Sequence, residues 1–505
     1  MTAEVRQPTR YVIAGGGIAG AMAGVAVATR LPTGSHSVTV LRDGGDADAS
    51  FGPVVATRPG IRRFHADLGV DEDALIRGGA ASFTLGTAYS GWSAVRPTYF
   101  LPYGDAGASI EGVPFHLLAA RLRTEGEKVA LADYSIAAML AQSGRFARPS
   151  DDPRSVLSTF TYGLHLHAAA YADALFGLAR RRGATIVRDA LGSVEVANGR
   201  IEALHLARGE RLVGDVFIDA TGARGALAGS LRGADLESCA GLFPFDRTAS
   251  AAIRASAPPA AYAHAAARSE GWRLTIPAAG IVGESFAYSS QLLSPDQAER
   301  LLLADCAGDL VSPPRDEAVK AGKRAPWNGN CVAIGAAAAV VEPLHSMPFS
   351  LLQNGVERLL RLLPASMEMQ AEANEYNRAT VEEIDRARDL ALLPYRLNGR
   401  AGEQSWDGAR QPSRNEKLER KIDLYRSRGR VPLLDGDLLD EAEWAALFDG
   451  HGITAARTDA LAEAIPLERL TSQLARMRQV MIQAISHLPS HGDYLRQLAR
   501  GAAAA

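Results

Sequence analysis

The sequence predicts an α/β fold of the Rossmann type, with a second, interleaved sheet and a helical C-terminal region. A glycine-rich turn joins a short apolar strand to an alanine-rich helix near the N-terminus, which is typical of the first unit of such a fold. From residue 366 onward, apolar residues recur at helical spacing and strand signals are few. The length of 505 residues also favours several interleaved parts over one simple core.

Composition excludes several classes of protein. The net charge of −3 favours neither nucleic acid nor an anionic membrane surface as a partner. The three cysteines, Cys239, Cys306 and Cys331, are far apart in the chain, so we expect a reducing cytoplasm, no disulfide framework and no metal site. No apolar run approaches the ~18 residues of a membrane span. We therefore expect a cytoplasmic protein that does not enter the membrane.

The first unit of the fold carries a dinucleotide-binding pattern. An apolar strand at 11–14 is followed by Gly15-Gly16-Gly17-Ile18-Ala19-Gly20, a helical stretch and a second strand at 37–41. Gly15 permits the tight turn, Gly17 lets the backbone approach a pyrophosphate, and Gly20 lets the helix pack on the strand. The N-terminus of the helix, at Ile18 and Ala19, then faces the phosphates with unpaired N–H groups.

The end of the second strand departs from this pattern. An acidic residue is expected there to bind the ribose hydroxyls, but Arg42 occupies the position and Asp43 follows it. Two interpretations are open: Asp43 takes the role by a one-residue shift, or Arg42 contacts a phosphate. We favour the shift.

Two later segments indicate FAD rather than NAD. The apolar strand in 214–225 ends at Ala220-Thr221-Gly222, and a second strand in 330–340 ends at Gly335. Both resemble later FAD-contacting segments of hydroxylase-like, two-domain flavoproteins. Since the chain has no second G-x-G-x-x-G, we expect reduced FAD to come from a separate flavin reductase.

Several motifs, in order, resemble those of the flavin-dependent tryptophan halogenase family. Residues 54–59 correspond to G-E-A-T-x-P, and residues 271–298 correspond to W-x-W-x-I-P followed by Y-S-S and S-D. Residues 330–347 correspond to N-C-V-A-I-G…E-P-L-E-S-T, and residues 376–395 to a C-terminal helical segment. The matching residues are Ala56, Thr57, Pro59, Trp272, Ile276, Pro277, Tyr288, Ser289, Ser290, Ser294 and Asp296, while Leu274 stands at the second tryptophan.

The resemblance implies a mechanism. In that family, reduced FAD and oxygen convert halide to hypohalous acid, which reaches a lysine through a tunnel. The lysine activates it beside an aromatic substrate, and a nearby glutamate takes up the ring proton. Ala56 and Thr57 would lie in the flavin-side loop.

The chain departs from the family at three catalytic positions. Thr84 stands at the lysine and can neither form a haloamine nor supply a cation. His345 stands at the glutamate, before Ser346, and an imidazole with a pKa of ~6.5 suits a general base. The family binds halide at backbone N–H groups that match Met347 and Pro348, and proline has none.

Three further residues are candidates for the substrate side. Trp272 and Trp92 are expected to form walls that stack on an aromatic substrate, although either would also suit a core. His165 alternates with His167 on a strand that enters a helix. A hydrogen-bonded pair at a strand edge is the simpler interpretation of these histidines.

The predicted organisation follows from these motifs. We expect the FAD-binding domain at 1–95, 155–240 and 315–365, substrate-side insertions at 96–154 and 241–314, and helices over 366–505. A homodimer is left open.

Three functions are compatible with the sequence. The leading one is an FAD-dependent oxidoreductase that uses externally reduced FAD and O2 on an aromatic or electron-rich substrate without standard halogenation. The second is a halogenase with a relocated amine, for which Lys320 and Lys323 are poorly placed, before the strand at 330. The third is a catalytically silent flavin-binding partner of an active paralogue.

Overall fold

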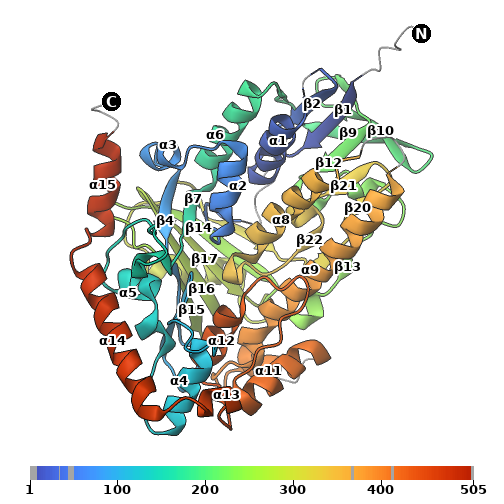
Figure 1. Ribbon diagram of the computed structural model, residues 1–505. Coiled ribbons are helices and arrows are strands. Elements are labelled where there is room, and N and C mark those ends of the chain that lie inside the picture. The colour runs from blue at the N-terminus through green and yellow to red at the C-terminus, as the bar shows by residue number, and fades with distance from the viewer. Residues whose placement is uncertain (1–7, 33, 44–50, 365–368, 411–414, 502–505) are drawn as a thin grey trace.

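The computed structural model describes residues 8–32, 34–43, 51–364, 369–410 and 415–501. It has two main sheets that lie side by side (Figure 1). The sheet that carries the N-terminal strands is at the upper right of Figure 1, the second sheet is in the middle, and C-terminal helices line the left and lower edges.

The first sheet has six strands. In order across the sheet they are β20 (Trp327–Asn328), β21 (Cys331–Ala333), β12 (Val216–Asp219), β1 (Thr9–Ala14), β2 (His36–Leu41) and β8 (Thr185–Val187). All neighbours are parallel except β20 and β21. The apolar segments at 11–14, 37–41, 214–225 and 330–340, although far apart in sequence, thus end at one edge of this sheet. The predicted Rossmann-type fold is confirmed.

Helix α1 (Ile18–Arg30) follows β1 and is buried along most of its length. Its sequence, IAGAMAGVAVATR, is rich in small residues, which suits a helix with neighbours on several sides. Those neighbours are α6 (Ala168–Arg181) and α8 (Met347–Arg361). The N-terminus of α1 is thereby fixed where the first sheet ends.

The second sheet has seven strands and is antiparallel except where β15 meets β5. In order they are β18 (Arg315–Ala318), β14 (Arg247–Arg254), β17 (Ile281–Tyr288), β16 (Gly271–Ala278), β15 (Ala263–Arg268), β5 (Gly86–Ser90) and β6 (Thr98–Pro102). Strand β6 forms one edge. Its register with β5 places Tyr89 opposite Tyr99 on one face, and Ala88 opposite Phe100 on the other.

A small sheet joins the two large ones. It consists of β3 (Val54–Ala56), β7 (Gly163–His167) and β4 (Ala81–Thr84), with β7 in the middle. The other short strands form two three-stranded sheets. One consists of β9 (Leu191–Ala197), β10 (Arg200–Leu206) and β11 (Arg211–Val213), and the other consists of β13 (Glu237–Ser238), β19 (Gly322–Lys323) and β22 (Ala339–Val340). The α-helices between strands are α2 (Gly60–Leu68), α3 (Glu72–Arg77), α4 (Phe115–Thr124), α5 (Ile136–Gln142) and α7 (Pro295–Ala304).

The described part of the chain beyond residue 369 is helical, as the sequence predicts. Its helices are α9 (Gln370–Arg396), α10 (Gln404–Asp407), α11 (Glu416–Arg428), α12 (Glu441–Gly450), α13 (Ala460–Glu463), α14 (Leu467–Ser486) and α15 (His491–Gly501). Helix α12 packs against the edge strand β6. The C-terminal region therefore covers the edge of the second sheet.

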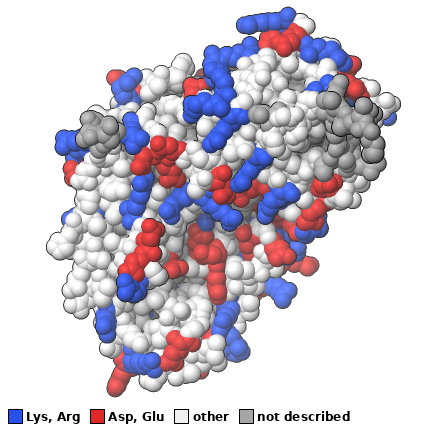
Figure 2. Space-filling view, turned by 45° about the horizontal axis from the view of Figure 1, so that its top comes forward, with Lys and Arg blue, Asp and Glu red and all other residues white. Residues whose placement is uncertain are grey.

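The surface mixes both signs of charge. Figure 2 shows acidic and basic side chains interspersed over one face of the molecule, in keeping with 54 Lys and Arg against 57 Asp and Glu. No helix within the described residues is long and apolar enough to cross a membrane.

A buried hydrogen-bonded chain ties the second sheet to the C-terminal helices. The indole N–H of Trp272 in β16 donates to the hydroxyl of Tyr395 in α9 over 2.7 Å. That hydroxyl donates to the Glu342 carboxyl group over 2.5 Å. Glu342 is 2% exposed, and burial raises its pKa to about 8. Glu342 is therefore protonated at neutral pH.

Stability should depend on pH through Glu342. The folded protein keeps a proton that an unfolded glutamate releases above about pH 4.3. The wild type therefore loses stability as the pH rises from there to about 8. Glu342→Gln removes this loss, so its free energy of unfolding should exceed that of the wild type by roughly 2–5 kcal/mol at pH 8 and by far less at pH 5. Denaturant unfolding at both pH values measures this, with the exposed Glu299→Gln as control. An equal difference at the two pH values would contradict a protonated Glu342.

Candidate functional site

The glycine turn between β1 and α1 allows two close backbone approaches. A Cβ atom on Gly15 would lie 2.3 Å from the carbonyl oxygen of Ala220, at the end of β12. One on Gly20 would lie 2.0 Å from the carbonyl oxygen of Gly15. Gly17 is the N-cap of α1 and brings no side chain to the helix N-terminus. Glycine at these positions thus keeps the turn compact and open to a ligand.

Asp43 lies next to this turn with one oxygen available. Its Oδ2 accepts a hydrogen bond from Arg224 over 2.9 Å, while its Oδ1 is buried without a hydrogen-bond partner among the described residues. Arg42 instead binds Asp173 over 2.6 Å and covers the ring of Phe176. Arg42 is thus occupied elsewhere, and the ribose-binding role of Asp43 stays a prediction.

A cleft of about 440 Å³ opens beside these residues. Its lining includes Gly16, Gly17, Arg42 and Asp43, together with Ser250 of β14. A glycine turn, a helix N-terminus and a buried acceptor fit the pyrophosphate and ribose of FAD. The residues present thus suit the predicted cofactor.

The two later segments meet at the same sheet edge. Asp219, which the sequence motifs did not predict, accepts hydrogen bonds from the backbone N–H groups of Thr221, Leu227 and Ala228 and from the Thr221 hydroxyl. The signal available in the sequence was the position of Asp219 at the end of an apolar strand, directly before Ala220-Thr221-Gly222. Thr221 is therefore tied to the turn itself. Gly222 and Gly335 both adopt the left-handed conformation that glycine favours, with φ of 70° and 55°.

The flavin-side loop after β3 is held by its backbone and by Thr57. The Thr57 hydroxyl accepts from the N–H of Leu164 over 2.8 Å, and its carbonyl accepts from the Tyr103 hydroxyl over 3.1 Å. Thr57 is fully buried and fixes the loop. The neighbouring Ala56 lines a cavity between strands of the second sheet and the turn that precedes α8.

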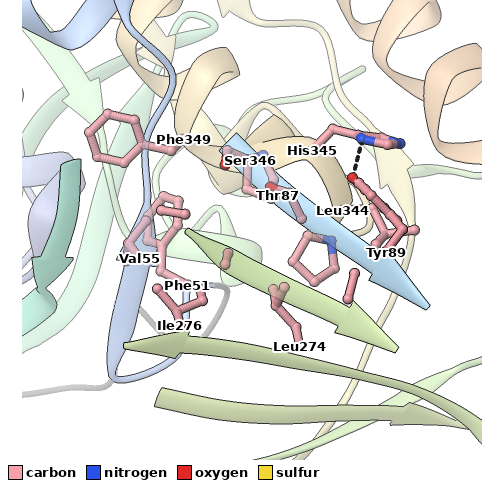
Figure 3. Close-up of a pocket in the computed structure, with 15 residues that line it drawn as sticks. Phe51, Val55, Thr87, Tyr89, Leu274, Ile276, Leu344, His345, Ser346 and Phe349 are labelled. Atoms are coloured by element: carbon pink, nitrogen blue, oxygen red, sulfur yellow. Dashed lines mark hydrogen bonds between the residues drawn. The ribbon is translucent and has the colours of Figure 1, made fainter. Parts of the chain in front are cut away.

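His345 lines this cavity, which is called the central cavity below. Figure 3 shows Thr87, Tyr89, Leu274 and Ile276 on the strands of the second sheet, with Ser346 and Phe349 opposite. Its volume of about 30 Å³ holds no more than a few water-sized molecules. The walls are mostly apolar and include Phe51, Val55 and Leu344. An oxygen-sized reactant fits this space, whereas an aromatic substrate would need its walls to move.

His345 and Ser346 are held in an unusual backbone conformation. Both are left-handed, with φ of 58° and 57°, and they are two of four such non-glycine residues in the described chain. Each costs on the order of 1–3 kcal/mol, and such strain tends to persist at functional sites. The strained turn ends where α8 begins, so Met347 and Pro348 form the first turn of that helix.

The strained turn directs the His345 side chain onto Tyr89. The Nδ1 atom of His345 lies 2.6 Å from the Tyr89 hydroxyl, and Nε2 is buried without a partner among the described residues. Burial, with smaller contributions from the charges of Arg58 and His451, lowers the pKa of His345 to about 3. The side chain is thus neutral at physiological pH and weaker as a base than the ordinary pKa of ~6.5 implies.

Thr84 lies at the end of β4 and is fully buried. Its hydroxyl donates to the carbonyl of Gly86 over 3.2 Å, so its one donor is used by the neighbouring backbone. The cavity around His345 is lined by Thr87 of the next strand and by no residue of β4.

No lysine lies in the wall of this cavity. The chain has five, Lys128, Lys320, Lys323, Lys417 and Lys421. Lys323 binds Asp385 over 3.1 Å, and Lys421 binds Asp437 over 2.6 Å. Both are therefore engaged in ion pairs and are not among the residues that line the cavity.

Arg58, a largely buried cation near His345, was not predicted from the sequence. Arg58 follows Thr57 in the segment 54–59 and binds both carboxylate oxygens of Glu443 in α12, over 2.5 and 2.6 Å. The guanidinium also lies over the ring of Tyr103. A buried ion pair gains little net stability, because desolvation offsets the attraction. The signal available in the sequence was an arginine at the variable position of the pattern G-E-A-T-x-P.

The remaining predicted residues lie in the core. Trp92 and Trp272 are fully buried; the Trp92 N–H donates to the Ala265 carbonyl over 3.0 Å, and Trp272 binds Tyr395. Neither borders the cavity around His345. His165 is buried in β7, and its Nδ1 lies 2.7 Å from the carbonyl oxygen of Pro277, so it too is placed away from the cavity wall.

The fold and the glycine turn define a flavoprotein of the hydroxylase-like type. Comparison with known proteins gives the family: the tryptophan halogenase model matches residues 10–467, and the chain belongs to that family. The family uses FAD, which a separate flavin reductase reduces. The prediction from the sequence motifs is therefore confirmed at the level of family and cofactor.

Individual relatives share the whole fold. The structure of BrvH, a flavin-dependent halogenase from Brevundimonas sp. BAL3, is 33% identical, covers 98% of this chain and 99% of its own, and has a TM-score of 0.91. Xcc4156, a flavin-dependent halogenase from Xanthomonas campestris, is 29% identical with the same coverage and TM-score. The 7-chloro-L-tryptophan 6-halogenase KtzR of Kutzneria sp. (strain 744) is 26% identical over 96% of this chain and 99% of its own.

The glycine turn should determine FAD affinity. Gly17→Asp places a carboxylate at the helix N-terminus beside the expected pyrophosphate, and like charges repel there. Titration of FAD, followed by flavin fluorescence, should show binding at least about tenfold weaker than in the wild type. Gly229→Asp is the matched control, since Gly229 faces open space. Unchanged affinity in Gly17→Asp would place the cofactor elsewhere.

Proposed function

We propose that this protein is an FAD-dependent oxygenase of the tryptophan halogenase family that oxidises an aromatic or electron-rich substrate without using halide. The observation that carries the proposal is the cavity around His345, which lies beside the flavin-side loop but is lined by no lysine. Thr84, at the lysine position, has its hydroxyl bound to the backbone of Gly86.

The cation near the cavity does not supply the missing chemistry. Arg58 is held by two short hydrogen bonds to Glu443, and a guanidinium stays protonated in proteins. It therefore cannot form a haloamine, and Glu443 holds its guanidinium in place. Arg58 helps to keep His345 neutral instead.

The place of halide is also altered. Pro348 lies in the first turn of α8 and in the cavity wall, so the wall lacks the backbone N–H that another residue would offer. A neutral imidazole replaces the carboxylate at position 345. Each of these changes removes an interaction that halogenation in this family requires, and none affects the glycine turn or Asp43.

The residues that remain suit oxygen transfer. FAD, when bound and reduced, supplies the two electrons with which O2 is activated. Walls that include the apolar Val55, Leu274 and Phe349 limit the cavity to a few water-sized molecules. Tyr89 fixes the His345 ring through Nδ1, which leaves Nε2 without a partner among the described residues and able to form one hydrogen bond with a bound substrate. One oxygen atom enters the product, and the other leaves as water.

The halide test separates this proposal from a halogenase with an unrecognised site. The protein is incubated with a flavin reductase, NADH, FAD, indole and bromide, and products are analysed by mass spectrometry. We expect no brominated indole above a control with reductase and FAD alone. Thr84→Lys should give none either, because Pro348 and His345 remain and each lost charged hydrogen bond costs ~1.5–3 kcal/mol, or about 10–100-fold in rate. Brominated product well above the control from the unmodified protein would overturn the proposal.

A further inference from the structure

Arg324 lies where the two later cofactor segments meet. It follows β19 in the chain, and its backbone N–H donates to the carbonyl of Ala338 over 2.8 Å. Its Nη1 donates to the carbonyl of Ala337 over 3.3 Å. Its Nη2 donates to the carbonyls of Ala223 and Arg224 over 3.3 and 3.4 Å. One guanidinium group therefore joins the turn after β12 to the turn after β21.

The two turns that Arg324 joins are short. Each is a single 3₁₀ turn, Gly222–Arg224 after β12 and Gly335–Ala337 after β21, and the two turns pack against each other. Turns of this length form few hydrogen bonds of their own, so their relative position depends on other contacts. Arginine carries five N–H donors in one plane and can serve carbonyls of both turns at once, whereas lysine offers its donors from a single point.

Gly225 makes room for the Arg324 side chain. It adopts the left-handed conformation, with φ of 53°, and a Cβ atom there would lie 2.8 Å from Nη1 of Arg324 and 2.9 Å from its Cζ. A methyl group at position 225 would therefore push the guanidinium away from the two turns. Gly225→Ala thus displaces Arg324 without removing it.

The partners of Arg324 are backbone carbonyls rather than carboxylates. Among the residues that the structure describes, Arg324 forms no ion pair. The neighbouring cations differ, since Arg224 binds Asp43 and Lys323 binds Asp385. Arg324 therefore does not neutralise an acidic group, and its contacts hold backbone segments in place.

The order of the strands indicates which part of FAD these turns reach. Across the first sheet, β2, β1, β12 and β21 are neighbours in that order. Asp43, which is predicted to bind ribose, follows β2, and the glycine turn, which is predicted to face the pyrophosphate, follows β1. A cofactor that lies along this edge continues past β12 and β21 with the part that ADP lacks.

We propose that Arg324 is a positioning residue of the FAD site, which holds the turns after β12 and β21 in the arrangement that the flavin half of the cofactor requires. It acts through the backbone of these turns. The proposal rests on the use of FAD by the family and not on the oxygenase reaction. A residue that only stabilised the fold would affect the binding of every part of the cofactor alike.

Binding of FAD and of ADP to the full-length protein tests the proposal. ADP carries the groups that the glycine turn and Asp43 are predicted to bind. FAD is titrated by flavin fluorescence and ADP by isothermal calorimetry. Arg324→Met should weaken FAD binding at least about tenfold, because hydrogen bonds from a charged donor are lost, and should change ADP affinity by less than about twofold. Unchanged FAD affinity, or an equal loss for FAD and ADP, would overturn the proposal.

Two further variants separate the geometry of Arg324 from its charge. Arg324→Lys keeps the charge but not the planar group of donors, so its FAD affinity should fall at least about fivefold. Gly225→Ala should act in the same direction. The matched controls, which should bind FAD as the wild type does, are Gly229→Ala, at a glycine that faces open space, and Arg232→Met, at an exposed arginine. FAD affinity equal to that of the wild type in both Arg324→Lys and Gly225→Ala would contradict a positioning role. Neither result depends on whether halide is used.

Discussion

The left-handed turn of His345 and Ser346 determines how the site is built. It directs the imidazole away from the helix that follows and onto Tyr89, and it starts α8 at the wall of the central cavity. The same turn brings Pro348 into that wall. Because two consecutive non-glycine residues adopt this conformation at a cost, the surrounding packing must hold them there. Leu344 and Met347, on either side, are both buried.

The cofactor side and the reaction side of the molecule differ in how far they keep the family pattern. On the cofactor side, glycines, a helix N-terminus and the free oxygen of Asp43 keep the pattern of a dinucleotide site. On the reaction side, Thr84, His345 and Pro348 stand where the family resemblance places a lysine, a glutamate and a halide-binding residue. Arg58 and Glu443 form an ion pair beside His345 that joins the flavin-side loop to α12. The interaction spans the region between cofactor domain and C-terminal helices, and it helps to set the charge state of His345.

The sequence predicted what depends on local pattern. The Gly15–Gly20 turn, the strands that end shortly before Thr221 and Gly335, and the helical C-terminal region are all found in the structure. Trp92 and Trp272 show the limit, because a tryptophan suits a substrate wall and a core equally well until its neighbours are known. The pKa of His345 was also beyond the sequence, since it depends on burial and on Arg58, which is far away in the chain. Glu443 lies 385 residues from its partner Arg58 in the sequence, and no local motif predicts such a contact.

The central claim is that oxygen, not halogen, is transferred at the cavity around His345. Incorporation of isotope from ¹⁸O2 tests it directly. The protein, a flavin reductase, NADH, FAD and bromide are incubated under ¹⁸O2 with indole and a panel of electron-rich aromatic compounds, and products are analysed by mass spectrometry. The account predicts a product that carries one ¹⁸O atom and no bromine, and that is lost in Gly17→Asp. A brominated product without the label would contradict it.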